Sequence, residues 1–138
     1  MVSRVEKMNA ATKAGLAYFG AVFVAGFMLG AIRVLVLVPR LGEVASVLLE
    51  TPVILAVSWL VSSWTTLKFR VSSAVSRRLL MGVVAFALLM LAEIGVSVFA
   101  FGRSIEDHFA AYRSSQGVIG LIAQIAFAFI PLMQRNWR

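Results

Sequence analysis

Ionisable side chains inside apolar segments are the residues of this sequence that could do chemistry. Arg33 interrupts the first apolar run of the chain. Glu50 and Glu93 lie in later apolar runs, and Gln124 lies in the last one. A charged side chain at the centre of a lipid-facing helix costs about 2.5–3.5 kcal/mol on insertion scales, so these groups need partners. The sequence therefore predicts a buried polar layer made of Arg33, Glu50, Glu93 and Gln124.

The four polar residues are expected at similar depths in a membrane. At 1.5 Å per helical residue, each lies about 9–13 Å from the turn that bounds its segment on one side. The reference residues for this count are Pro39, Glu43, Gly102 and Gly117. Polar side chains that reach the same depth from different helices can meet in one layer.

Glycines accompany two of these residues on the same helical face. Gly26 and Gly30 precede Arg33 by seven and three residues, and Gly117 and Gly120 precede Gln124 by seven and four. Small residues on a membrane helix allow a neighbouring backbone to approach closely. We therefore expect these faces to pack against other helices.

Pairing of Arg33 with Glu50 is the contact that the sequence favours, because their two segments form a hairpin with a short turn. One guanidinium can serve two carboxylates, so Glu93 is a candidate third member of an acid–arginine–acid cluster. Two interpretations stay open. The layer is either a proton- or cation-linked site with Glu93 as its titrating group, or a set of structural contacts that docks the helices.

Hydroxyl side chains follow one face of the second segment at Thr51, Ser58, Ser62 and Thr65. They could line a polar path that leads away from Glu50. Hydroxyls in membrane helices more often bond to the carbonyl four residues earlier or to a neighbouring helix. The second interpretation is favoured.

The sequence contains few residues that could bind a metal or a cofactor. His108 is the only histidine and follows Glu106 and Asp107 in a segment expected to be a solvated loop, where a metal site is disfavoured. The absence of cysteine removes disulfides and thiolate sites. No nucleophile–histidine arrangement or phosphate-binding loop occurs. We predict no cofactor and no metal site, and the sequence carries no enzyme signature that would decide for or against an activity.

The elements that position these residues follow from composition. The sequence is 61% hydrophobic and only 14% charged over 138 residues, whereas soluble domains have about 25% charged residues. Four apolar segments, approximately 14–38, 43–67, 79–101 and 116–133, approach the roughly 20 residues that cross a bilayer. Only helices satisfy their own backbone hydrogen bonds there. The prediction is an all-α integral membrane protein, a single domain over 1–138 that forms a four-helix transmembrane bundle.

Two of the three prolines raise questions about segment bounds. Pro39 is expected to end the first helix, because proline disfavours a helical conformation in the residue before it. Pro52 allows either one bent helix from Glu43 to Leu67, or a helix that begins at Thr51 after a surface segment. The single helix is favoured, since the shorter alternative is only about 24 Å long.

Positive charges predict the orientation. Nine Lys and Arg residues lie on the side of both termini and three on the other. The first set is Arg4, Lys7, Lys13, Lys68, Arg70, Arg77, Arg78, Arg135 and Arg138; the second is Arg40, Arg103 and Arg113. By the positive-inside rule both termini face the cytoplasm of a cell inner membrane. Trp64 and Trp137 fall near that boundary, as indoles prefer.

Two function classes are favoured over a third, a lipid-binding or lipid-modifying protein that uses Arg33 or Arg40 to bind a phosphate. The first is a small membrane protein that moves a proton, an ion or a small solute. The second is a non-catalytic accessory or assembly subunit whose polar layer is purely structural. A bundle this thin favours a homo-oligomer or a membrane-complex partner besides the lipid bilayer. The net charge of +7 is concentrated in short connecting segments, which indicates contact with lipid head groups and not with nucleic acid.

Overall fold

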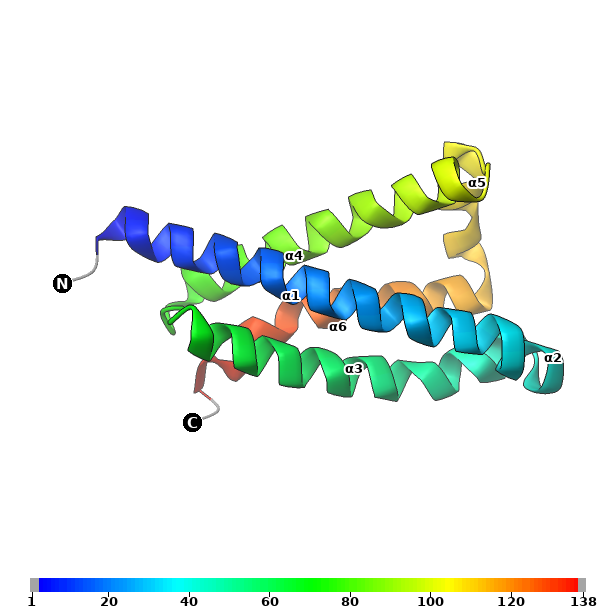
Figure 1. Cartoon of the computed structure of the whole chain (residues 1–138), viewed down its shortest axis with the longest axis horizontal. Coiled ribbons are helices and arrows are strands. Elements are labelled where there is room, and N and C mark those ends of the chain that lie inside the picture. Colours follow the sequence, from blue (N-terminus) through cyan, green and yellow to red (C-terminus); the bar gives the residue numbers. More distant parts are fainter. Residues whose placement is uncertain (1–2, 137–138) are drawn as a thin grey trace.

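The computed structural model describes residues 3–136, and this part of the chain is all-helical (Figure 1). Four helices are long and apolar enough to cross a membrane, with bounds Arg4–Leu41, Glu43–Lys68, Val75–Ala100 and Ser115–Met133. The predicted all-α class and the four membrane-length helices are therefore confirmed. Trp137 and Arg138, which entered the orientation argument, lie outside the described residues.

The helices are labelled in chain order. The first long helix comprises α1 (Arg4–Ile32), a π-helical turn (Arg33–Leu37) and α2 (Val38–Leu41). The second is α3 (Glu43–Lys68). The third comprises α4 (Val75–Gly95) and a second π-helical turn (Val96–Ala100). A short helix α5 (Ile105–Ala110) and a 3-10 turn precede α6 (Ser115–Met133), and a 3-10 turn (Gln134–Asn136) follows it.

The first helix is longer than the sequence predicted at both ends. It begins at Arg4 because Ser3 caps it: the Ser3 hydroxyl accepts a hydrogen bond from the Glu6 backbone N–H at 3.1 Å. The expectation that Pro39 ends this helix was wrong, since Val38 has helical torsion angles of φ −60° and ψ −45°. The π-helical turn explains this result. Val38 N–H donates to the carbonyl of Arg33, and this wider turn accommodates a ring that would clash in a regular α-helix.

The second helix settles the question raised by Pro52. It is continuous from Glu43 to Lys68 with Pro52 inside it, as the favoured interpretation predicted. The turn before it is tight, because Gly42 adopts a φ of +84°, which glycine reaches without steric cost. The first and second helices thus form an antiparallel hairpin, as their contacts and Figure 1 show.

The segment from Arg103 to Ser115 was predicted as a loop and contains helix α5 instead. Serine caps explain its local structure: Ser104 accepts from the N–H of Asp107 at 3.0 Å, and Ser114 accepts from the N–H of Gly117 at 3.1 Å. Serine followed by a helix start is a common N-terminal signal that the sequence carries at both positions.

The four long helices pack as a square, in which α1 and α6 each contact both α3 and α4. Both termini lie at one end of the bundle, here called the terminal end, and α5 lies at the other, the α5 end (Figure 1). The core cluster consists of Ala11, Ala14, Tyr18, Val22, Val71, Met81, Ala85 and Phe127. No described residue of the first helix after Val22 is fully buried. The tightly packed part therefore lies toward the terminal end.

Two glycines make this tight packing feasible. A Cβ on Gly15 would lie 2.8 Å from the carbonyl oxygen of Met81, and a Cβ on Gly82 would overlap the carbonyl oxygen of Ala128. These contacts bring α1 against α4, and α4 against α6. Beyond the crossing, α1 and α4 diverge toward the α5 end (Figure 1).

Candidate functional site

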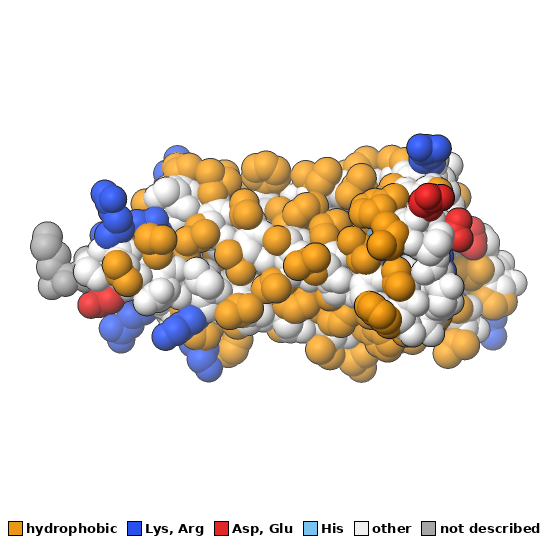
Figure 2. Space-filling view, turned by 90° about the horizontal axis from the view of Figure 1, so that it is seen from above, with side chains coloured by type: hydrophobic (Ala, Val, Ile, Leu, Met, Phe, Trp, Pro, Cys, Tyr) orange, Lys and Arg blue, Asp and Glu red, His pale blue; other side chains and the backbone are white. Residues whose placement is uncertain are grey.

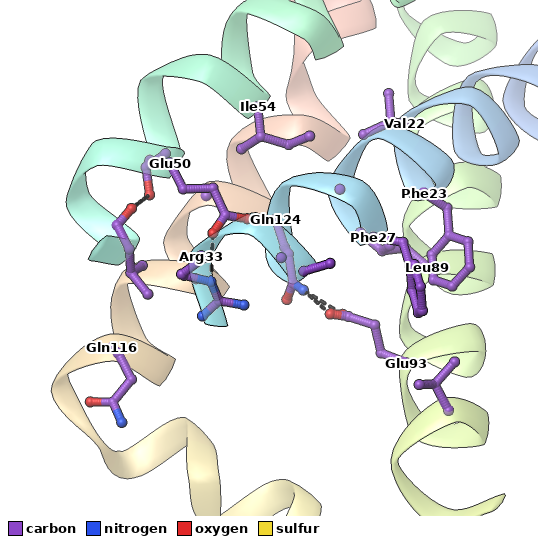
Figure 3. Close-up of a pocket in the computed structure, with 18 of the residues that line it drawn as sticks. Val22, Phe23, Phe27, Arg33, Glu50, Ile54, Leu89, Glu93, Gln116 and Gln124 are labelled. Atoms are coloured by element: carbon purple, nitrogen blue, oxygen red, sulfur yellow. Dashed lines mark hydrogen bonds and ion pairs between the residues drawn. The ribbon is translucent and has the colours of Figure 1, made fainter. Parts of the chain in front are cut away.

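A cavity of about 750 Å³, here called the central cavity, lies between the four long helices on the α5 side of the core. Its size is within the range of about 300–1,000 Å³ typical of small-molecule sites. The wall is mostly apolar, and each long helix contributes polar side chains (Figure 3). Arg33, Glu50, Glu93 and Gln124 all line it. The structure thus brings the four residues of the predicted polar layer to one cavity.

Arg33 and Glu50 form an ion pair on the wall made by the first two helices. Arg33 Nε lies 2.6 Å from Glu50 Oε2, so the pairing that the hairpin predicted is present. Arg33 is the first residue of the π-helical turn, and Glu50 lies about two turns after the start of α3 at Glu43. This contact matches both charges and joins the first long helix to α3 inside the apolar part of the bundle.

Glu93 forms a separate pair with Gln124 on the opposite wall. Gln124 Nε2 donates to both carboxylate oxygens of Glu93, which joins α4 to α6. The predicted acid–arginine–acid cluster does not form, because Arg33 pairs only with Glu50 in the described part of the chain. The cluster is absent because α1 diverges from α4, which places Glu50 and Glu93 on different walls of the cavity (Figure 3).

Besides the ion-paired atoms Arg33 Nε and Glu50 Oε2, two buried polar atoms of the cavity wall have no hydrogen-bond partner among the described residues. They are Gln124 Oε1 and Ser97 Oγ, and the Ser97 side chain is only 5% exposed. Buried polar atoms are usually paired with protein or water, and each exception calls for an explanation. These atoms, with the Glu93 carboxylate, give one wall of the cavity spare capacity for a polar ligand.

The predicted glycine faces serve a different purpose from helix packing. A Cβ on Gly120 would meet nothing within 4 Å, and one on Gly26 would make only an ordinary 3.7 Å contact with Ile54. Gly26, Gly30 and Gly120 instead line the central cavity. Gly117 contacts Ala111 and Ser114, within its own capping segment. Close helix packing occurs at Gly15 and Gly82, so the packing role expected of these four glycines was wrong.

The hydroxyl face of α3 bonds mainly to its own helix. Thr51 donates to Val47 O at 2.7 Å and Ser58 donates to Ile54 O at 2.7 Å. Thr65 donates to Val61 O at 2.9 Å, whereas Ser62 donates to Gln134 Oε1 at 2.7 Å. Thr51 and Ser58 line the central cavity, but Ser62 and Thr65 do not. The four hydroxyls therefore form no continuous polar path in this conformation.

An aromatic contact closes the cavity toward the terminal end, and sequence reasoning missed it. The rings of Tyr18 and Phe127 stack with centroids 4.3 Å apart, and the Tyr18 hydroxyl donates to the Phe127 carbonyl at 2.6 Å. This contact spans the diagonal of the square from α1 to α6. A tyrosine in an apolar run could have indicated a buried partner, because a buried phenol needs a hydrogen bond.

The opposite side of the cavity is bordered by residues of the α5 end. Arg103 and His108 line the cavity there. The pKa of His108 lies below its ordinary value, first because burial removes water from the ring and second because Arg103 is positive. The pKa of Tyr112, whose hydroxyl lies 3.4 Å from His108 Nε2, is raised by burial and by the charge of Glu93. Within residues 3–136 no group of three potential metal-ligating side chains occurs.

Comparison of the chain with protein-family models, with curated proteins and with solved structures finds no match.

Proposed function

We propose that the protein is a small multi-pass membrane protein that binds a proton, an ion or a small solute in the central cavity and moves it across the bilayer. The observation that carries the proposal is the position of Glu93 and the partner of its side chain. This carboxylate lines a cavity between membrane-length helices and has an amide as its partner. Among the described residues, no cation lies within ion-pair distance of it.

The chemistry of the wall favours a positively charged or proton-donating ligand. The charge of Arg33 is already matched by Glu50, so the remaining fixed charge within the apolar layer is that of Glu93. An isolated carboxylate in an apolar environment is stabilised by a proton or by a cation. Gln124 Oε1 and Ser97 Oγ offer additional acceptors. The apolar remainder of the wall suits the hydrocarbon part of a small organic cation.

Movement across the bilayer requires the Tyr18–Phe127 contact to open. In the present conformation the stacked rings separate the cavity from the terminal end. A translocating bundle alternates between states that expose a binding site to one side and then to the other. The conformation described here corresponds to the state that is closed at the terminal end.

The proposal includes an orientation with both termini in the cytoplasm of an inner membrane. Lysine and arginine side chains gather at the terminal end, whereas most acidic side chains in view lie at the opposite end (Figure 2). This asymmetry follows the positive-inside rule. Large apolar side chains such as Leu35 and Phe99 are exposed along the bundle, which suits contact with lipid or with a second copy of the chain.

Flux measurements on Glu93→Gln test the function. The substitution keeps an acceptor for Gln124 and removes the charge. Purified protein in liposomes is tested for proton flux and for exchange of small organic cations. Wild type is expected to show flux, and Glu93→Gln to reduce it at least tenfold. Glu43→Gln is the matched control, because Glu43 lies at the α5 end and outside the cavity wall, and it should retain wild-type flux.

The competing proposal is an accessory subunit in which the two polar pairs only dock helices. The supporting observation is that Arg33–Glu50 and Glu93–Gln124 each join two neighbouring helices. Absence of flux in wild type, or full flux in Glu93→Gln, would contradict translocation. Recovery of a stoichiometric membrane partner on native purification would then support the accessory role.

A further inference from the structure

A second cavity, here called the basic pocket, lies at the terminal end where α3 and α6 finish and α4 begins. Its volume is about 390 Å³. Arg70, Arg78 and Arg135 line it together with the hydroxyl residues Thr66 and Ser73, and no carboxylate is among its lining residues. Arg70 and Arg135 make no ion pair with any described acidic residue. The pocket therefore combines positive charge with hydroxyl groups at one edge of the bundle.

The backbone of Arg70 is strained in a way that glycine would avoid. Arg70 has a φ of +53°, in the left-handed region that disfavours residues with a Cβ. It follows the end of α3 in a Schellman motif, in which Val71 N–H donates to Thr66 O at 2.9 Å and Arg70 N–H to Leu67 O at 3.3 Å. Glycine is the usual residue at this position. Strained residues of this kind are concentrated at functional sites.

The other two arginines differ, because Arg78 is buried and bonded to backbone carbonyls whereas the Arg135 side chain is exposed. Arg78 is 6% exposed and donates to the carbonyls of Ser72 and Pro131. Arg135 lies in the 3-10 turn after α6 beside the buried Gln134. Gln134 in turn accepts from Ser62 and donates to Trp59 O at 2.9 Å. Hydrogen bonds of Arg78 and Gln134 therefore join the segments that surround the pocket.

The helix ends do not neutralise this charge. The C-termini of α3 and α6 both lie at the basic pocket, and each carries about half a negative charge from its aligned peptide dipoles. The guanidinium groups of Arg70 and Arg135 alone, against two half-charges, leave an excess of about one positive charge. A phosphate group carries roughly one to two negative charges near neutral pH and accepts bonds from guanidinium and hydroxyl groups.

We propose that the basic pocket binds a phosphate group, held by the side chains of Arg70, Arg135 and Ser73 beside the fixed charge of Arg78. The group belongs either to the head of an anionic phospholipid or to free phosphate, since both present the same oxygens. The site is independent of the central cavity and of the translocation proposal. The proposed site accounts for the presence of arginine at position 70. Glycine there would relieve the backbone strain but would supply no charge to the pocket.

Binding to lipid is measured on the full chain in detergent at physiological salt by native mass spectrometry. Phosphatidylglycerol and phosphatidylcholine are titrated separately, and inorganic phosphate is titrated by calorimetry. If the ligand is a lipid head group, wild type should bind one phosphatidylglycerol at least tenfold more tightly than phosphatidylcholine. If the ligand is free phosphate, wild type should bind one inorganic phosphate at least tenfold more tightly than phosphatidylcholine. Arg70→Gly and Arg135→Gln should each weaken this binding about fivefold, which corresponds to about 1 kcal/mol.

Arg77→Gln is the matched control, because Arg77 lies in the first turn of α4 at the same end and does not line the pocket. It should change binding less than twofold. Arg70→Gly should melt at the same or a higher temperature than wild type, which separates lost binding from lost folding. Equal weakening by Arg77→Gln and the pocket variants would overturn the proposal. So would equal binding of phosphatidylglycerol and phosphatidylcholine by a wild-type protein that takes up no phosphate.

Discussion

The ion pair between Arg33 and Glu50 makes a quantitative prediction about the stability of the bundle. Its perturbation is a double-mutant cycle with Arg33→Met and Glu50→Gln. Methionine preserves much of the apolar length of arginine, and glutamine preserves the shape of glutamate. Each single variant leaves one charge without its partner inside the apolar layer, whereas the double variant leaves none.

The expected magnitude follows from burial. Removing one partner of a fully buried ion pair costs about 3–5 kcal/mol. Here the two side chains are 31% and 16% exposed, and solvent screening reduces the cost of each single variant to about 2–3 kcal/mol. The double variant should recover part of the sum of these losses, with a coupling energy of about 1–2 kcal/mol.

Reversible unfolding in mixed micelles measures the four free energies of unfolding. A parallel cycle with Arg40→Met and Glu43→Gln is the control, since these residues lie at the same end and no ion pair joins them. Its two losses should add within about 0.5 kcal/mol. If the Arg33/Glu50 losses also add within that range, the reasoning that treats the pair as an energetic contact is refuted.

Two other predictions concern packing and pH. Gly82→Ala should destabilise the bundle by about 1–3 kcal/mol, because its Cβ would overlap the Ala128 carbonyl oxygen. The control Gly20→Ala, whose Cβ would meet nothing within 4 Å, should be neutral or stabilising. Equal melting temperatures of the two variants would contradict this prediction. The pKa of His108 is lowered by the fold, so the unfolded chain binds more protons and stability should fall as pH drops from about 6.5. His108→Gln should flatten that part of a melting-temperature profile between pH 7.5 and 5.5, and parallel wild-type and variant profiles would exclude the effect.

Hydrophobic composition and length were enough to predict the helices, because lipid leaves a chain of this kind few other structures. The Arg33–Glu50 contact was also accessible, since the hairpin places neighbouring segments at matching depths. Details that depend on local backbone geometry were not. The prediction that Pro39 ends its helix failed because a π-helical turn at Arg33–Leu37 accommodates the ring. Such a turn has no simple sequence pattern.

The acid–arginine–acid cluster failed for a reason that depth alone cannot reveal. Matching depth places side chains in a common layer, but contact also depends on the angle between helices. Gly15 and Gly82 allow α1, α4 and α6 to meet closely near the terminal end, and α1 and α4 then diverge (Figure 1). Glu93 consequently pairs with Gln124 and not with Arg33.

The same divergence links the packing of the bundle to its proposed function. A bundle whose four helix axes stayed equally close along their length would fill its centre with side chains. A cluster of two acids with one arginine would likewise leave little room for a ligand. Crossing at one end and separation at the other leave the central cavity, with the matched pair on one wall and Glu93 on the other (Figure 3). Arg33 is therefore withheld from Glu93 by helix geometry, and Glu93 stays available to a proton or a cation. On this argument the glycines at positions 15 and 82 are as necessary to the proposed site as the acid itself, although neither lines the cavity.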